Sequence, residues 1–240
     1  RFNFINELAD YIFTTGEKVR DDMIEYNRIK ANKIISIPTG IDESIFNPES
    51  FNREECRKKL TINDSEIAIG ILAVLRQFKR HDLFLKMAKS LIKKYPGKRL
   101  VFIIAGNGPQ KENIEKIIND LNLAENVKMV GHINNVPEFL CAIDILVLSS
   151  DSKEGVPQSV MQGLFMNKPV VSSDSGSTRD LFNHNNFQLI QKGSIEALIN
   201  GVSIYLDNMN EVSSRKYMME NFSSSVMVKK IITSYEKILE

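Results

Sequence analysis

Short runs of consecutive apolar residues, many of them β-branched, alternate with helical segments along most of this chain. Such runs are typical of strands buried on both faces of a parallel sheet, and they span 66–74, 99–106, 127–131, 145–150, 169–174 and 186–190. The segments between them have helical periodicity and cover 82–95, 110–123, 136–143 and 157–167. Strand–helix–strand units of this kind need right-handed crossovers. The sequence therefore predicts an α/β fold built on a doubly wound, parallel, six-stranded, Rossmann-like sheet.

Further elements lie outside this block. Two strand-like runs flank a polar helical segment near the beginning of the chain, at 9–15 and 33–38. The turn-rich stretch that follows, 38–49, contains two prolines and a glycine and is typical of a linker. Two helical segments close the chain, at 194–208 and 224–240. The first residue is Arg1 and not Met, so we expect the chain to begin inside a longer protein.

Composition excludes several classes of protein. The chain has 31 Lys and Arg against 30 Asp and Glu, a net charge of +1. This balance argues against a protein that binds nucleic acid by neutralising many phosphates. No apolar run approaches the roughly 18 residues of a membrane-spanning helix, and no signal peptide opens the chain. We therefore expect a cytoplasmic protein.

Cysteine and histidine give no sign of a metal site. Cys56 and Cys141 lie far apart in the sequence and form neither a CxxC pair nor another metal-binding spacing. Two unpaired thiols suit a reducing cytosol, and a single disulfide between them is the alternative. His81, His132 and His184 are isolated from one another. We expect no metal cofactor.

The loops that follow the strands are the places to look for a ligand, because open parallel sheets bind ligands at the carboxyl ends of their strands. The loop after the first predicted strand contains Arg76, Lys79 and Arg80 in a chain of almost neutral charge. Arg favours forked contacts to phosphate and Lys favours point contacts, so Arg76 and Lys79 can together bind a diphosphate without a metal ion. The alternative, about equally favoured, is a solvated surface cluster.

The loop after the fourth predicted strand leads into a helix that has Pro157 at its first turn. A helix that begins in this way leaves its first backbone N–H groups free, here those of Gln158, Ser159 and Val160. Free N–H groups at a helix N-terminus bind anions, above all phosphates. A sugar nucleotide fits the combination of this helix start with the basic loop.

Other ligand motifs are incomplete. Gly106 and Gly108 form a GxG sequence, but Lys111 occupies the place of the third glycine, which counts against NAD and FAD. Gly106 is better explained by a tight turn, whereas Gly108 can also allow a ligand to approach closely. The chain contains neither a GxSxG elbow nor a GxxxxGK[ST] loop.

The segment SSDSKEGVPQSVMQGLFMNKPVVSSDSGS, residues 149–177, resembles the signature of retaining GT-B glycosyltransferases of family 4, also called group 1. The family pattern is a Glu-Gly-x-Pro turn that opens a helix, a second Glu eight positions later, then Pro-Val-Val and a Ser/Gly loop. Other segments agree in order and spacing, among them ADYIFTTGEKVRDDM, AVLRQFKRHDLFLKMAKSL and VKMVGHINNVPEFLCAIDILVLSS. The resemblance covers about residues 8–182.

The resemblance implies two facing Rossmann-like domains, of which the second binds the nucleotide-sugar donor and the first binds the acceptor. On this basis residues 1–40 are the end of the acceptor domain with the interdomain linker, and 41–215 are the donor domain. Residues 216–240 would be a C-terminal helix that returns toward the acceptor domain. Most of the acceptor domain would lie outside this chain.

The resemblance also implies roles for individual residues. Glu154 would contact the sugar hydroxyls and orient the donor for catalysis, while Arg76 and Lys79 would hold the diphosphate. His132 and Ile133 would lie beside the base. The remaining substrate-binding residues would be Gly108, Gly155, Val156, Pro157, Gln158, Ser159 and Gln162. Positive groups would stabilise the departing diphosphate while the acceptor attacks from the same face of the sugar.

Two positions depart from the family pattern, and one is Thr39 of PTGID, which stands in place of the Asn of the commoner Pro-Asn-Gly at the hinge. The second Glu is Gln162 here. A carboxylate can accept hydrogen bonds from both ribose hydroxyls, whereas a Gln has one acceptor oxygen and two donors. Recognition of the ribose should therefore weaken, unless position 162 is simply an exposed helical residue.

The expected function is transfer of a sugar from a nucleoside-diphosphate sugar to a saccharide or lipid-linked acceptor with retention, in surface polysaccharide or glycolipid synthesis. The full-length protein would bind its acceptor through the missing domain, with peripheral contact to the inner membrane face as an option and no nucleic-acid partner. The chain alone would be inactive. A non-catalytic nucleotide-sugar-binding module or partner subunit is the alternative, and a nucleotide-sugar epimerase is a third hypothesis without a supporting motif.

Overall fold

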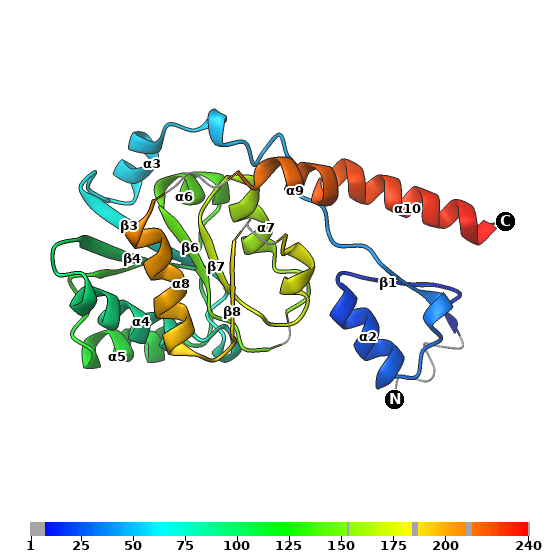
Figure 1. The fold of residues 1–240 in the computed structure, drawn as a ribbon, viewed down its shortest axis with the longest axis horizontal. Coiled ribbons are helices and arrows are strands. Elements are labelled where there is room, and N and C mark those ends of the chain that lie inside the picture. The colour runs from blue at the N-terminus through cyan, green and yellow to red at the C-terminus, as the bar shows by residue number, and fades with distance from the viewer. Residues whose placement is uncertain (1–7, 153, 184–186, 210–212, 240) are drawn as a thin grey trace.

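The computed structural model describes residues 8–152, 154–183, 187–209 and 213–239 (Figure 1). Six parallel strands form one sheet in the order β5-β4-β3-β6-β7-β8. They are β3 (Glu66–Leu72), β4 (Arg99–Ala105), β5 (Val127–Gly131), β6 (Ile145–Leu148), β7 (Val170–Ser173) and β8 (Gln188–Ile190). Each corresponds to one of the six predicted runs, so the predicted α/β sheet is confirmed.

The strand order reverses in the middle of the sheet. From β3 the chain adds β4 and then β5 on one side, and it returns to add β6, β7 and β8 on the other. The loops after β3 and β6 therefore leave the carboxyl edge in opposite directions and open a crevice between them. This is the switch point at which sheets of this type bind ligands.

Helices cover both faces of the sheet because the strands are apolar on successive residues. All four residues of β6 are buried, and β4 is buried from Leu100 to Ala105. Two hydrophobic clusters result, one on each face. One face packs against α4 (His81–Lys94), α5 (Lys111–Asp120) and α8 (Ile195–Asp207). The other packs against α3 (Arg53–Lys59), α6 (Val136–Ala142), α7 (Gln158–Phe165) and α9 (Arg215–Phe222).

Helix α4 shows how the sequence sets this packing. Leu83, Met87 and Leu91 recur four residues apart and are buried against the sheet, as an amphipathic helix requires. The lysines of α4, including Lys86 and Lys89, lie on its exposed face.

The N-terminal residues form a separate small unit (Figure 1). Strands β1 (Ile12–Thr14) and β2 (Ile34–Ser36) pair in parallel, with α2 (Glu17–Glu25) between them in the sequence. Helix α10 (Ser224–Leu239) extends from the sheet domain to this unit, where Tyr235 meets Phe13 edge to face at 5.9 Å.

The helical segment expected over 216–240 is divided into two helices in the described residues. Helix α9 ends where Ser223 takes an extended backbone conformation, and α10 begins at Ser224. A contact with a distant part of the chain accompanies the break. Ile41 donates its N–H to Phe222 O at 3.0 Å, and its carbonyl oxygen accepts the Ser224 N–H at 2.8 Å. The segment after β2 thus pairs briefly with the chain between the two helices.

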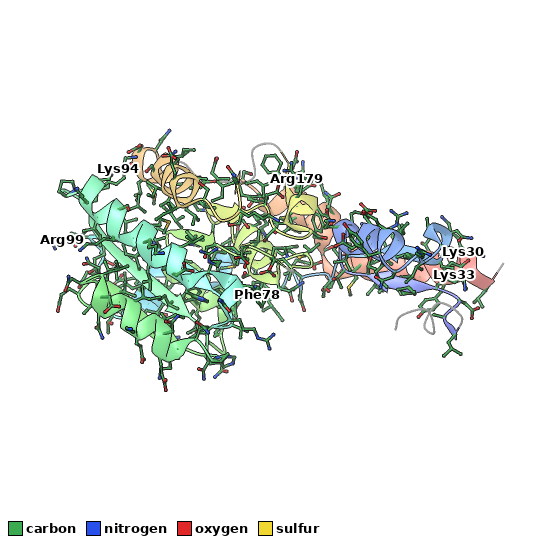
Figure 2. All side chains as sticks on the ribbon, turned by 90° about the horizontal axis from the view of Figure 1, so that it is seen from below. Lys30, Lys33, Phe78, Lys94, Arg99 and Arg179 are labelled. Carbon is green, nitrogen blue, oxygen red and sulfur yellow. The ribbon has the colours of Figure 1, made fainter. Side chains whose placement is uncertain are left out.

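The N-terminus of α2 is capped by the sheet domain. Gly16 precedes the helix and has no side chain with which to cap it. Instead, the Glu17 N–H donates to Asp180 Oδ2 at 2.7 Å and the Lys18 N–H donates to Ser177 Oγ at 3.1 Å. A Cβ at position 16 would lie 2.2 Å from Ser177 Oγ, so glycine is needed for this approach. Figure 2 shows nearby Arg179 at the junction, between Lys94 and Arg99 at one end of the molecule and Lys30 and Lys33 at the other.

Removing this cap should loosen the N-terminal unit. In the double variant Ser177→Ala/Asp180→Ala, two N–H groups of α2 lose their acceptors, and we expect about 1–2 kcal/mol of local stability to be lost. Hydrogen exchange followed by mass spectrometry should show faster exchange in α2. Ser194→Ala is the matched control, because Ser194 caps α8 by accepting the Ala197 N–H and should accelerate exchange only there. Unchanged α2 exchange in the double variant would contradict the contact.

Candidate donor-binding site

A pocket of about 470 Å³ lies at the carboxyl edge of the sheet, beside β3, β4 and β5. Its walls come from the loops that follow these strands and from the beginning of α7. The pocket brings together most of the residues predicted for the site, namely Lys79, His132, Ile133, Glu154, Val156, Pro157, Gln158, Ser159 and Gln162. Asn107, from the loop after β4, also lines it and was not predicted, although it stands in the AGNGPQ segment considered in the sequence analysis.

Lys79 and Glu154 form an ion pair inside this pocket. Lys79 Nζ donates to Glu154 Oε1 at 2.5 Å, and the two side chains are only 15% and 9% exposed. The loop that carries Lys79 is held in place because the Ser149 hydroxyl at the end of β6 donates to Lys79 O at 2.9 Å. The opposite charge of Glu154 thus holds the lysine ammonium at the pocket wall.

Helix α7 presents its N-terminus to the same pocket. Pro157 is its N-cap, one position before the predicted first turn, and no side chain caps the helix. The first N–H with an acceptor in the helix is that of Met161, which donates to Pro157 O at 3.2 Å. In the described part of the chain, no acceptor is found for the N–H groups of Gln158, Ser159 and Val160. The predicted anion-binding helix start therefore stands next to Lys79.

The loop after β7 holds the backbone of Glu154. Gly176 has φ +57°, and a Cβ there would lie 1.7 Å from Glu154 O. The next residue, Ser177, donates its N–H to Glu154 O at 3.3 Å. Only glycine allows this close approach, because the left-handed conformation and the space both exclude a side chain. On the other side, a Cβ on Gly155 would come within 2.9 Å of Thr15 Oγ1 in the N-terminal unit.

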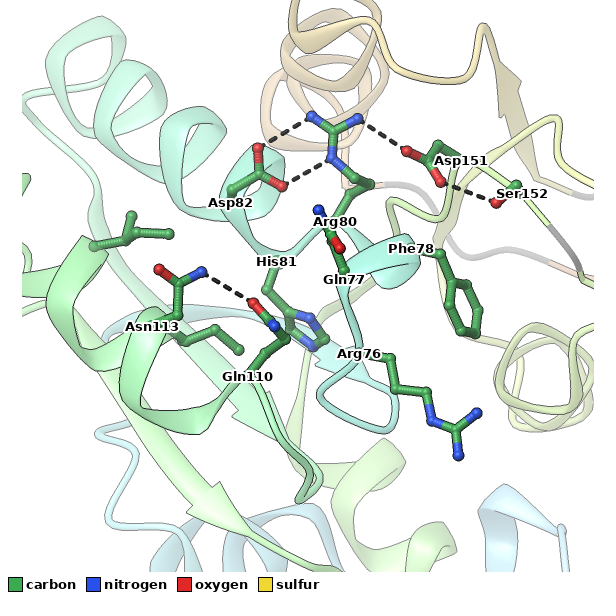
Figure 3. Close-up of a pocket in the computed structure, with 12 residues that line it drawn as sticks. Arg76, Gln77, Phe78, Arg80, His81, Asp82, Gln110, Asn113, Asp151 and Ser152 are labelled. Carbon is green, nitrogen blue, oxygen red and sulfur yellow. Dashed lines mark hydrogen bonds and ion pairs between the residues drawn. The ribbon is translucent and has the colours of Figure 1, made fainter.

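Three predicted site residues, Arg76, Gly108 and Gly155, do not line this pocket. Arg76 is exposed, lines the neighbouring pocket, and points its guanidinium away from Arg80 and Asp82 in Figure 3. No hydrogen bond or ion pair holds this guanidinium among the described residues, and its part in diphosphate binding stays a prediction. Gly108 does not line the pocket: a Cβ there would meet Leu75 O at 2.7 Å. The close approach that Gly108 allows is made by the protein's own backbone.

Gln162 faces the pocket from α7. It is half-buried, so it is not the simply exposed helical residue that the sequence left open. In the described structure its amide has no hydrogen-bond partner and is available to a ligand.

The described residues offer no metal site and no membrane-spanning helix. They contain no group of three or more His, Cys, Asp or Glu side chains placed to hold a metal ion. Among the same residues, no helix is both long enough and apolar enough to span a bilayer. Cys56 and Cys141 are both buried and unbridged.

His81 is the first residue of α4, two positions after Lys79, and it is only 3% exposed. Burial, and secondly the nearby charge of Lys79, lower its pKa from 6.5 to about 4. The folded protein therefore keeps this imidazole neutral at a pH where the unfolded chain binds a proton.

This difference predicts acid destabilisation that depends on His81. As the pH falls from 6.5 to about 4, only the unfolded chain takes up the proton, so the free energy of unfolding decreases; below about 4 both states are protonated and the loss stops. The full loss is about 3 kcal/mol. Urea unfolding at several pH values should show a shallower acid dependence for His81→Gln than for the native chain. Parallel curves for the two proteins would contradict the prediction.

Comparisons with known proteins bear on the family and the fold. Residues 52–223 match the profile of a family described as "Glycosyl transferases group 1". The chain is 28% identical over 173 residues to the "Uncharacterized glycosyltransferase MJ1059" of Methanocaldococcus jannaschii, covering 72% of this chain and 42% of that protein. It is 26% identical over 210 residues to the Escherichia coli "UDP-Gal:alpha-D-GlcNAc-diphosphoundecaprenol alpha-1,3-galactosyltransferase", covering 85% and 54%.

A similar fold is found in solved structures. The crystal structure of Anabaena Alr3699/HepE in complex with UDP and glucose superposes with a TM-score of 0.88 at 16% identity, covering 98% of this chain and 65% of that one. This likeness concerns the fold alone. The chain spans about half the length of the curated relatives it matches.

Proposed function

The chain belongs to the group 1 glycosyl transferases, and from this membership we propose that it is the donor-binding part of a glycosyltransferase. The donor is a nucleoside-diphosphate sugar, and the sugar is transferred with retention, as in family 4. The observation that carries the proposal is the pocket in which Lys79, Glu154 and the uncapped start of α7 meet.

The pocket suits the departure of a diphosphate. Lys79 exchanges its contact with Glu154 for one with the diphosphate, and the free N–H groups at the start of α7 donate to the same anion. Preorganised donors of this kind stabilise charge that develops on a leaving group. Arg76 is held by no other described residue and turns toward the phosphates when they are bound. No metal ion is needed, since these groups supply the positive charge.

Glu154, once released from Lys79, accepts hydrogen bonds from the hydroxyls of the donor sugar. It orients the donor and does not act as a conventional base. His132 and Ile133 also line the pocket, and the base lies beside them in this proposal. The acceptor hydroxyl attacks from the face that the diphosphate leaves.

The names of relatives support a role in surface polysaccharides or glycolipids. They include a teichuronic acid biosynthesis glycosyltransferase, a lipopolysaccharide core mannosyltransferase and an O-antigen biosynthesis glycosyltransferase. We propose a saccharide or lipid-linked acceptor, bound by the domain of which residues 1–40 are the end. The proposal places the enzyme in the cytoplasm, at the inner membrane face.

Calorimetric titration with UDP and with GDP tests the proposal. At least one should bind this chain, and the binding should persist in EDTA. Failure of both nucleotides to bind would count against a donor site. Transfer from the matching sugar nucleotide is then tested in a protein that also carries the acceptor domain, because we expect this chain alone to be inactive.

A non-catalytic nucleotide-sugar-binding module is the second candidate, and Gln162 is the observation that favours it. A pocket that binds the nucleotide without transfer by the complete protein would support this role. Sustained transfer would exclude it.

Gln162→Glu should strengthen nucleotide binding. A carboxylate at this position accepts hydrogen bonds from both ribose hydroxyls, and we expect about three- to tenfold tighter binding for one added hydrogen bond. Calorimetry with the nucleoside diphosphate that binds measures the change. Its 2′,3′-dideoxy analogue is the control and should show no gain. Equal gains for both nucleotides would mean that position 162 does not read the ribose.

A further inference from the structure

A second cavity of about 680 Å³ lies on the other side of the loop between β3 and α4. It is bordered by the N-terminal ends of α4 and α5 and by Asp151 and Ser152, which follow β6 (Figure 3). Its lining residues have no member in common with those of the donor pocket. The cavity is therefore a separate place at the same edge of the sheet, and its volume is ordinary for a small-molecule site.

The most unusual group in its lining is His81. The residue is 3% exposed, and neither Nδ1 nor Nε2 has a hydrogen-bond partner within the described ranges. Buried polar side chains are nearly always hydrogen-bonded. A neutral imidazole has one donor and one acceptor nitrogen, so a group that satisfies both must itself donate and accept. Hydroxyl groups do both, whereas the dianion of a phosphate monoester only accepts and an ammonium only donates.

The charges in the lining also disfavour an ion. Arg80 donates to both oxygens of Asp82, at 2.9 and 3.1 Å, and to Asp151 Oδ2 at 3.1 Å. With Arg76, the two cations and two carboxylates of the lining balance, and Lys86 Nζ, 3.7 Å from Asp82 Oδ2, compensates the carboxylates when Arg76 turns to the donor pocket. An anion therefore gains nothing here. The fixed carboxylates keep lone pairs that can accept hydrogen bonds from hydroxyl groups.

Donors and an apolar surface complete the lining. The amides of Gln110 and Asn113 lie together at the beginning of α5 in the lining of the cavity, where Asn113 Nδ2 donates to Gln110 Oε1 at 3.0 Å (Figure 3). Ile114 and Ile117 of α5 supply the apolar part. The nitrogens of His81 are closed to solvent, so a ligand reaches them only after a side chain of the lining, such as that of Gln110, turns aside. That movement breaks one hydrogen bond, to the exposed side chain of Asn113.

We propose that this cavity binds one residue of a neutral saccharide. Its hydroxyls donate to Asp82 and Asp151 and accept from the amides of Gln110 and Asn113, and one hydroxyl displaces Gln110 to pair with His81. The apolar C–H face of the sugar ring packs on Ile114 and Ile117. The site is distinct from the donor-sugar position at Glu154.

Imidazole NMR tests the proposal directly. The chain contains three histidines, so a sample labelled with ¹³C in the imidazoles gives few signals, and that of His81 is identified by its loss in His81→Gln. The probes are the methyl glycosides of glucose, galactose, mannose and N-acetylglucosamine. We expect at least one to shift the His81 signal saturably, with a Kd in the millimolar range that is ordinary for a single sugar.

Two variants separate this cavity from the donor pocket. Asn113→Ala changes an exposed side chain and should weaken the binding about three- to tenfold, the value of one hydrogen bond. Glu154→Gln should leave it unchanged. The proposal is overturned if no glycoside moves the His81 signal, in which case the cavity holds only solvent. It is equally overturned if Glu154→Gln abolishes the shift while Asn113→Ala does not, or if inorganic phosphate reproduces the shift.

Discussion

Replacing Lys79 by methionine is expected to weaken nucleoside diphosphate binding by about 10- to 100-fold. Methionine keeps much of the side-chain length but removes the ammonium, and a hydrogen bond to a charged group contributes about 1.5–3 kcal/mol. The effect is large because Lys79 is 15% exposed, so water replaces its charge poorly. Calorimetry on the native and variant chains, with the same nucleotide, measures the loss.

Glu154→Gln should act in the opposite direction on the nucleotide. In the free protein Glu154 holds Lys79 Nζ at 2.5 Å, so it competes with the diphosphate for that ammonium. Removing its charge should tighten UDP or GDP binding while it abolishes the additional affinity of the corresponding sugar nucleotide. A residue that orients the sugar should change these two affinities in opposite directions. A residue that only supports the fold should lower both.

Lys86→Met is the matched control for Lys79→Met. Lys86 lies on the exposed face of α4, with its side chain 53% exposed, and nucleotide affinity should not change in this variant. Because Lys79→Met leaves Glu154 buried without its partner, thermal unfolding of both variants and of Lys79→Met/Glu154→Gln should accompany the titrations. Equal nucleotide affinity in the Lys79 and Lys86 variants would remove Lys79 from the site.

The largest loss of stability is expected from Arg57→Met. Arg57 is fully buried between α3 and the sheet, and it donates to Asp144 Oδ2 at 3.2 Å and to the backbone oxygens of Asn63 and Glu66, each at 2.6 Å. Asp144 Oδ2 also accepts the Ala68 N–H at 2.7 Å. Methionine fills similar space but donates no hydrogen bond, so Asp144 Oδ2 keeps only the Ala68 N–H and Asn63 O keeps only the Glu66 N–H. Breaking a buried pair in this way costs about 3–5 kcal/mol.

Urea unfolding of Arg57→Met and Arg53→Met checks this expectation. Arg53 contacts the same carboxylate, but its side chain is 49% exposed, and an exposed ion pair contributes about 0–1 kcal/mol. The two variants remove the same charge from the two sides of Asp144. If they destabilise the protein equally, the burial of Arg57 does not determine its contribution.

The sheet could be predicted from the sequence because burial on both faces leaves a direct pattern. A short run such as β6, apolar at every position, indicates a strand that is buried on both faces of a parallel sheet. Helix α9 was not predicted as an element of its own. Its two buried residues, Met218 and Phe222, give too short a periodicity, and its end is set by the pairing of Ser223 with Ile41, which is distant in the sequence.

The same distinction applies to the site. The sequence alone predicts that Lys79, Glu154 and the start of α7 lie close together. Each follows a strand, and the carboxyl ends of parallel strands meet at one edge of the sheet. The orientation of a long side chain such as Arg76 is not determined in this way. Neither is a contact between two loops, which is why the backbone neighbour of Gly108 was not foreseen. The pairing of Arg57 with Asp144 is another contact that the order of the strands does not determine.

The short loop of Gly176 and Ser177 touches two parts of the molecule at once. Ser177 donates its backbone N–H to Glu154 O and accepts the Lys18 N–H of α2 through its hydroxyl. A motion that carried α2 away from the sheet domain would pull on the same residue that holds the backbone of Glu154. If Glu154 orients the donor as we propose, movement of α2 away from the sheet domain would therefore change the position of Glu154 as well. A substitution that weakens the contact of Ser177 with Lys18 should therefore also affect its contact with Glu154.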